Sequence, residues 1–160
     1  PEAYTRALRG ALPVSEAAMH RATMVATRFS IVTTLPRTVI IARHLLRQYG
    51  FEHHCAAVHA IDLPVLALED GSGIAQEKVR QRCIQAMRED DSGAIVLGCS
   101  GMADLARELT HELGVPVIDG VGAAVKRVES LLALGLNTSK HGDLDYPIRK
   151  KLSGQFERLN

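Results

Sequence analysis

The sequence predicts an α/β fold in which a parallel β-sheet carries helices on both faces. Short apolar runs rich in β-branched residues alternate along the chain with longer amphipathic stretches, a pattern typical of strand–helix repeats. Glycines, prolines and small polar residues separate these segments. Strands that are joined through helices run parallel, so their carboxyl ends meet at one edge of the sheet. We expect that edge to bind a ligand.

The first half of the chain contains the opening strands and helices of this pattern. Helices are predicted at 2–9, 16–25 and 36–49, and strands at 12–14, 29–34 and 55–61. Ser15 is a typical N-cap for the second helix. Pro36 fits the first turn of the third helix, which Gly50 ends. Pro64 indicates that residues 63–68 form a loop or an edge segment rather than a central strand.

The second half repeats the alternation and then becomes polar. Helices are predicted at 74–89, at 102–113 and within 121–136, and strands at 94–97 and 115–118. The longest of these helices carries Val79 and Cys83 on its apolar side. Four consecutive apolar residues at 94–97 indicate a buried strand. Polar residues predominate from Asn137 onward, so the segment 137–160 is interpreted as a surface tail.

Composition and charge exclude several classes of protein. Nineteen basic and eighteen acidic residues leave a net charge of +1, so nucleic acid is not a favoured partner. No apolar run approaches the ~20 residues of a membrane span, and the start of the sequence does not resemble a signal peptide. Three cysteines without C-x-x-C spacing argue against a disulfide framework and against a zinc site. They favour the reducing cytoplasm as the location.

The turn Gly98-Cys99-Ser100-Gly101 is the strongest candidate site. Cys99 follows a buried strand and precedes a predicted helix, where the helix dipole and free backbone N–H groups favour a thiolate. The two glycines leave the space above the thiol open, and the N–H groups of Ser100 and Gly101 could hold a carboxylate or an imide oxygen. The alternative is a cysteine that only packs in the core, as we expect for Cys83.

Polar residues elsewhere on the predicted ligand edge are weaker candidates. Thr33 and Thr34 end a strand at this edge. Glu16 begins a helix beside it, where its carboxylate could accept a hydrogen bond from a substrate N–H, although a solvated or capping role is the default. Cys55 follows two histidines but has no distant ligands of matching spacing, so no metal site is predicted. P-loop, dinucleotide-binding and nucleophile-elbow motifs are absent from the sequence.

Four stretches together resemble a known family: 30–35, 63–70, 94–105 and 114–121. They resemble the hydantoin and allantoin racemases of the cofactor-independent aspartate/glutamate racemase superfamily. The most specific part is the block Gly-Cys-Ser-Gly-Met-Ala-Asp-Leu at 98–105, whereas the Val-Thr-Thr strand end is weaker. The resemblance runs from about Ser15 to about Gly142.

The resemblance implies a two-base racemase with two Rossmann-like lobes, each of which gives one cysteine to a site between them. One thiolate removes the proton next to the substrate carbonyl, and the opposite thiol delivers a proton to the other face. Cys99 matches the second cysteine of that pattern. Thr33, Thr34 and the Ser100-Gly101 turn match positions that hold the polar groups of the substrate. This chemistry requires no metal, pyridoxal phosphate or nicotinamide cofactor.

The first cysteine of the family pattern would be expected just before Pro1. Neither Cys55 nor Cys83 is predicted to lie at a strand-to-helix turn on the ligand edge. We therefore expect the chain to be part of a protein of more than about 200 residues and to be unable to racemise by itself. The expected organisation is a remainder of the N-terminal lobe, a second lobe carrying Cys99, a helix packing back on the lobes, and a polar tail: 1–27, 28–120, 121–136 and 137–160.

Other functions remain open at this point. The same fold could serve an amino-acid racemase or, with one cysteine, a decarboxylase such as the arylmalonate decarboxylases. The chain could also be a non-catalytic domain that binds a small molecule. In every case we expect a small-molecule partner. Because the family often assembles, we also expect a homo-oligomer, and neither nucleic acid nor a membrane is an expected partner.

Overall fold

A computed structural model describes residues 14–68, 73–147 and 153–159. Its centre is a four-stranded parallel sheet with the order β2-β1-β3-β4. The strands are β1 (Phe29–Thr33), β2 (Cys55–Ala60), β3 (Ala94–Leu97) and β4 (Val117–Asp119). The two central strands, β1 and β3, are buried along their whole length. The prediction of a parallel α/β sheet is confirmed.

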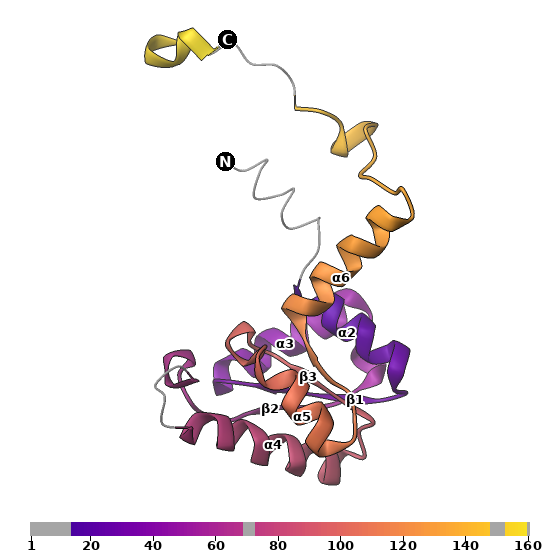
Figure 1. Ribbon diagram of the computed structural model, residues 1–160, viewed down its shortest axis with the longest axis vertical. Coiled ribbons are helices and arrows are strands. Elements are labelled where there is room, and N and C mark those ends of the chain that lie inside the picture. The colour runs from indigo at the N-terminus through magenta and orange to yellow at the C-terminus, as the bar shows by residue number, and fades with distance from the viewer. Residues whose placement is uncertain (1–13, 69–72, 148–152, 160) are drawn as a thin grey trace.

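Helices cover both faces of this sheet (Figure 1). One layer contains α2 (Val14–Val25) and α3 (Pro36–Tyr49), and α6 (Gly120–Ala133) packs on α2. The opposite layer contains α4 (Ile74–Asp90) and α5 (Leu105–Leu113). Three short 3₁₀ helices lie in the connections of the described residues, and two more follow α6: Glu52–His54, Val65–Leu68 and Ser100–Met102, then Gly142–Leu144 and Gly154–Leu159.

The alternation of side chains along the strands divides the core into two apolar layers. Ile31 and Val96 face α2 and α3, where they meet Met19 and other buried residues. Val32 and Leu97 face the other way and pack with residues of α4 and α5. Both faces of β3 therefore meet an apolar layer, which explains why 94–97 is an unbroken apolar run.

The helix α3 begins and ends where the sequence predicts. Pro36 occupies its first turn, where the missing N–H costs no hydrogen bond. Gly50 adopts a left-handed conformation with φ of +77°, and its N–H donates to the Arg47 carbonyl. The prediction for 63–68 also holds, because Val65–Leu68 forms a single 3₁₀ turn after Pro64.

The helix α2 begins earlier than predicted. Val14 is already helical, so Ser15 lies inside the first turn and is not the N-cap. Tertiary packing explains this start, because the Val14 backbone and side chain lie directly against the first residue of α6, Gly120. The strand predicted at 12–14 is therefore wrong at Val14, and its other residues lie outside the described residues. The helix predicted at 2–9 also lies outside them.

The helix α5 begins three residues later than predicted, at Leu105 rather than Met102. A 3₁₀ turn, Ser100–Met102, comes first, and it buries the Met102 side chain completely in the core beside α4. The strand β4 is shifted toward Asp119, whose carboxylate accepts a 2.6 Å hydrogen bond from the Gly122 N–H and caps α6. Among the described residues, no helix is long and apolar enough to cross a membrane.

Candidate functional site

A cavity of about 390 Å³ opens at the carboxyl ends of β1 and β3. Of the residues singled out in the sequence, Thr33, Gly98, Cys99 and Ser100 line it. Its other walls are mainly apolar and come from α2, α3 and the start of α6. Its position agrees with the ligand edge expected for a parallel sheet, and its walls would exclude water from most of a small ligand.

Cys99 stands at the junction between β3 and the 3₁₀ turn. Its backbone is extended, with φ of −142° and ψ of 133°, and its carbonyl accepts a 3.1 Å hydrogen bond from the Met102 N–H. The thiol is partly exposed and lines the cavity. The α-helix expected to begin at Met102 begins at Leu105, so the 3₁₀ turn Ser100–Met102 lies between the thiol and the N-terminus of α5.

The other two cysteines lie outside the cavity lining. Cys83 is completely buried on α4, and burial raises the pKa of its thiol to about 12, although the neighbouring Arg82 charge opposes this. Burial, reinforced by the negative charge of Asp90, also raises the pKa of Cys55 to about 12. Neither thiol is suited to act as a base near neutral pH.

Gly98 is required by the close packing of the strand ends. Its N–H donates a 2.8 Å hydrogen bond to the Val32 carbonyl. A Cβ at this position would lie 2.9 Å from the Cβ of Thr33, so no larger residue fits without a shift. This contact brings the Cys99 turn against the end of β1.

The two threonines at the carboxyl end of β1, Thr33 within the strand and Thr34 directly after it, have different surroundings. Thr33 lines the cavity, and its hydroxyl is 2.8 Å from the hydroxyl of Thr38. Thr34 is buried outside the cavity lining, and its carbonyl accepts a 3.2 Å hydrogen bond from the Leu63 N–H. Of this pair, the structure brings only Thr33 to the cavity.

Gly101 and Glu16 also lie outside the lining. Gly101 packs against the side chains of Leu68 and Val65 in the 3₁₀ turn before α4. The Glu16 carboxylate forms a 3.2 Å ion pair with Arg127 of α6. This pair links α2 to α6 beside the cavity. The Glu16 carboxylate therefore already accepts a hydrogen bond from Arg127, a partner that the sequence did not indicate.

Several lining residues were missed in the sequence, and the helices α2 and α3 contribute most of them. Thr38, Ile41 and Leu45 line the cavity at helical spacing. The helix 36–49 was expected, and its place directly after the strand 29–34 was the available signal. A helix that follows a strand at the ligand edge places its first turns beside that edge.

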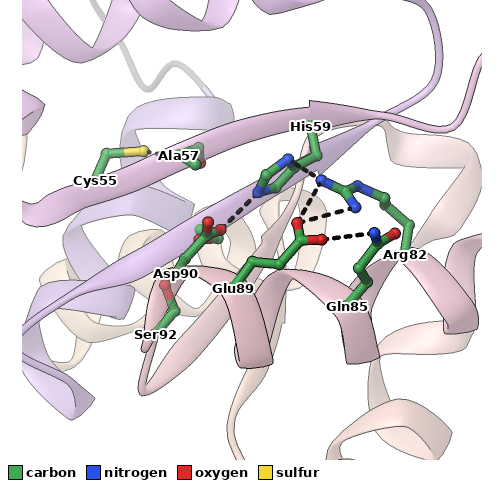
Figure 2. A network of polar contacts seen from close by, with 9 residues as sticks. Cys55, Ala57, His59, Arg82, Gln85, Glu89, Asp90 and Ser92 are labelled. Atoms are coloured by element: carbon green, nitrogen blue, oxygen red, sulfur yellow. Dashed lines mark hydrogen bonds and ion pairs between the residues drawn. The ribbon is translucent and has the colours of Figure 1, made fainter.

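A second cluster of polar side chains lies beside α4 (Figure 2), and none of its residues lines the cavity. His59 of β2 stands between Arg82 and Asp90. Because Arg82 can only donate, the His59 Nδ1 accepts, and its Nε2–H donates to the Asp90 carboxylate at 2.6 Å. The Ser30 hydroxyl donates to the same carboxylate oxygen at 2.5 Å.

This cluster fixes the end of α4 to the sheet. Burial by itself would raise the pKa of Asp90, but the hydrogen bonds from Ser30 and His59, together with the Arg82 charge, outweigh burial and lower the pKa. The carboxylate is therefore ionised, and one of its oxygens accepts hydrogen bonds from both Ser30 and His59. In the described part of the chain, no three histidine, cysteine or acidic side chains are grouped so that they could hold a metal ion.

The fold and the cavity define a class: a parallel α/β protein with a cysteine at a sheet-edge cavity. Residues 11–128 match the family described as Asp/Glu/Hydantoin racemase. The chain therefore belongs to this family.

Relatives within this family include hydantoin racemases and allantoin racemases. A hydantoin racemase of Rhizobium meliloti is 48% identical over 141 residues, which is 88% of this chain and 58% of that protein. An allantoin racemase from Klebsiella pneumoniae has 79% identity and a TM-score of 0.81, covering 92% of this chain and 60% of that one. The allantoin racemase of Pseudomonas fluorescens has 42% identity and a TM-score of 0.76, and the match covers 88% of this chain and 60% of that one. Racemases are isomerases, and this chain spans about three fifths of the length of these relatives.

Proposed function

We propose that this chain carries the Cys99 half of a cofactor-independent racemase that acts on a hydantoin-type substrate, either hydantoin or allantoin. The observation that carries the proposal is that Cys99 and Thr33 line one cavity at the carboxyl ends of β3 and β1. Membership of the racemase family and the names of the relatives support the substrate class.

The proposed reaction moves one proton at a carbon next to a carbonyl. The Cys99 thiolate removes this proton and becomes a thiol, and the electron pair of the C–H bond moves into the adjacent carbonyl as an enolate. A second thiol on the opposite face then protonates the carbon. We propose Ser100, which lines the cavity, as the donor that stabilises the enolate oxygen. The substrate retains all its electrons, so the proposal requires no cofactor.

The opposing thiol is proposed to come from outside these 160 residues. Cys55 and Cys83 do not line the cavity, and burial raises the pKa of each to about 12. The proposed organisation places the Cys99 lobe at 28–120, with 1–27 belonging to a second lobe, 121–136 packing back on the lobes and 137–160 as a tail. In such a protein the described cavity would form one wall of the complete site.

We further propose assembly of the complete protein into a homo-oligomer in the cytoplasm. Free thiols at all three cysteines suit a reducing compartment. Apolar side chains are exposed along α6, which projects beyond the sheet (Figure 1): Val121, Val125, Val128, Leu131 and Leu132. Exposed apolar surface of this kind is typical of a face that another protein surface covers. In the complete protein the lobes would cover part of α6, and we propose that a second copy covers the rest.

Exchange of the substrate proton with deuterated solvent tests the proposal. We expect the chain extended to the length of its relatives to exchange the ring C–H of a substituted hydantoin or of allantoin. Cys99→Ser should abolish this exchange, whereas the control Cys55→Ser should retain it, because a serine can still donate to the Ala57 carbonyl as Cys55 does. The same assays on the unextended chain should show no racemisation.

The alternatives give different results. Release of carbon dioxide from an arylmalonate without racemisation would indicate a decarboxylase. Exchange of a free amino acid in preference to a hydantoin would indicate an amino-acid racemase. If Cys99→Ala binds the ring with unchanged affinity and the wild type never exchanges its proton, the chain is a binding domain and the proposed catalysis is wrong.

A further inference from the structure

The Thr38 hydroxyl contacts two oxygen atoms, and its single proton can serve only one of them. It lies 2.6 Å from the Leu35 carbonyl and 2.8 Å from the Thr33 hydroxyl. A carbonyl oxygen can only accept, so the Thr38 proton goes to Leu35. Thr38 must then accept the hydrogen bond from Thr33.

This arrangement fixes the polarity of Thr33. Its proton points to Thr38, and the Gly98 carbonyl, the other acceptor within reach, is 3.5 Å away and competes weakly. Thr33 therefore has only lone pairs left for a molecule in the cavity. A polar ligand group that meets this oxygen must be a hydrogen-bond donor.

We propose that Thr38 is a positioning residue that makes Thr33 an obligatory hydrogen-bond acceptor, and that the site thereby selects rings with an N–H beside the reacting carbon. The inference rests on the proposed function, because Thr33 and Cys99 line the same cavity. A hydantoin ring has such an N–H on the nitrogen bonded to its reacting carbon. A ring with an ether oxygen at that position offers only lone pairs to the Thr33 oxygen, so no hydrogen bond forms between them.

Thr38→Val is a suitable variant because the local fold does not depend on the hydroxyl. The Leu35 carbonyl also accepts the Thr38 backbone N–H at 2.9 Å, so the start of α3 remains hydrogen-bonded. Valine has nearly the same shape as threonine. A matched control is Thr23→Val, because the Thr23 hydroxyl makes the same bond, to the His20 carbonyl at 2.8 Å, on an exposed part of α2 outside the cavity lining.

The experiment compares the binding of a methylhydantoin with that of the methyl oxazolidinedione in which this N–H is replaced by oxygen. Calorimetry is performed on the chain extended to the length of its relatives, below the pH at which either ring loses a proton. We expect the wild type to prefer the hydantoin by about tenfold or more, the worth of one hydrogen bond. In Thr38→Val the preference should fall to within about threefold, because the Thr33 proton is free to turn toward the ring oxygen.

Thr38→Ser and Thr23→Val should both keep the wild-type preference. An unchanged preference in Thr38→Val, a lost preference in Thr23→Val, or no preference in the wild type would each overturn the inference. Proton exchange is measured in parallel, because binding with the expected preference but without exchange would overturn the proposed racemase and leave the role of Thr38 intact. Proton exchange without the expected binding preference would overturn the role of Thr38 and leave the proposed racemase intact.

Discussion

Gly98→Ala would insert a methyl group between the ends of the two central strands, and we expect it to reduce both stability and catalysis. The added Cβ would lie 2.9 Å from the Cβ of Thr33 and 3.2 Å from the Cγ2 of Ile31. Carbon atoms in contact are normally about 3.5–4.0 Å apart, so the overlap with Thr33 is roughly 0.6–1.1 Å. A collision of this size must move one of the two strand ends.

The expected loss of stability in Gly98→Ala depends on how far Thr33 can move away from the added methyl group. The Cβ of Thr33 cannot rotate away, because it is bonded directly to the backbone of β1, and β1 pairs with β2 and β3 on its two sides. Overpacking at such positions costs about 1–3 kcal/mol. For a chain of this size each kcal/mol lowers Tm by about 2–4 °C, so a cost of about 2 kcal/mol corresponds to roughly 4–8 °C.

Thermal unfolding and deuterium exchange together test this prediction. Gly114→Ala is the control, because Gly114 has φ of +68° but open space around it, and it lies outside the cavity lining. That variant should also unfold earlier, by strain of about 1 kcal/mol, but should exchange substrate at the wild-type rate per folded molecule. Gly98→Ala should lose at least about tenfold in exchange, since Thr33 moves away from Cys99. A Gly98→Ala protein with wild-type Tm and exchange would refute the packing argument.

Two further predictions follow from the cysteines and from the cluster at the end of α4. Cys99 should react with iodoacetamide at least about tenfold faster than Cys55 or Cys83, because desolvation raises the pKa of each of these two thiols to about 12, and peptide mass spectrometry identifies the modified residue. Equal labelling of all three would contradict the raised pKa values of Cys55 and Cys83. Asp90→Asn should destabilise the protein by about 1–3 kcal/mol at neutral pH. Because the pKa of Asp90 is lowered in the folded state, its contribution is present above the ordinary aspartate pKa and is lost as pH falls through the folded value, so urea unfolding should show the gap between the variant and wild type closing in acid. A gap that widens in acid would contradict this sign.

The parts of the fold that depend on local pattern could be predicted from the sequence. The apolar run at 94–97 is a central strand because both of its faces are buried, and Gly50 ends α3 because it adopts a left-handed conformation. The starts of α2 and α5 could not be predicted in this way. Val14 is helical because it packs on Gly120, and Met102 lies in a 3₁₀ turn that buries its side chain beside α4. Contacts between distant segments decide both boundaries.

The same distinction applies to the cavity. Thr33, Gly98 and Cys99 are fixed to the sheet edge, so the rule that parallel strands end together was sufficient to group them. The surroundings of Glu16 could not be deduced, because its partner Arg127 is 111 residues away in the sequence. Thr38 is the most instructive case, since neither its spacing nor its polarity distinguishes it from any other threonine. Only the distances to two oxygen atoms, one of which cannot donate, establish the direction of the hydrogen bond and therefore what the cavity offers to a ligand.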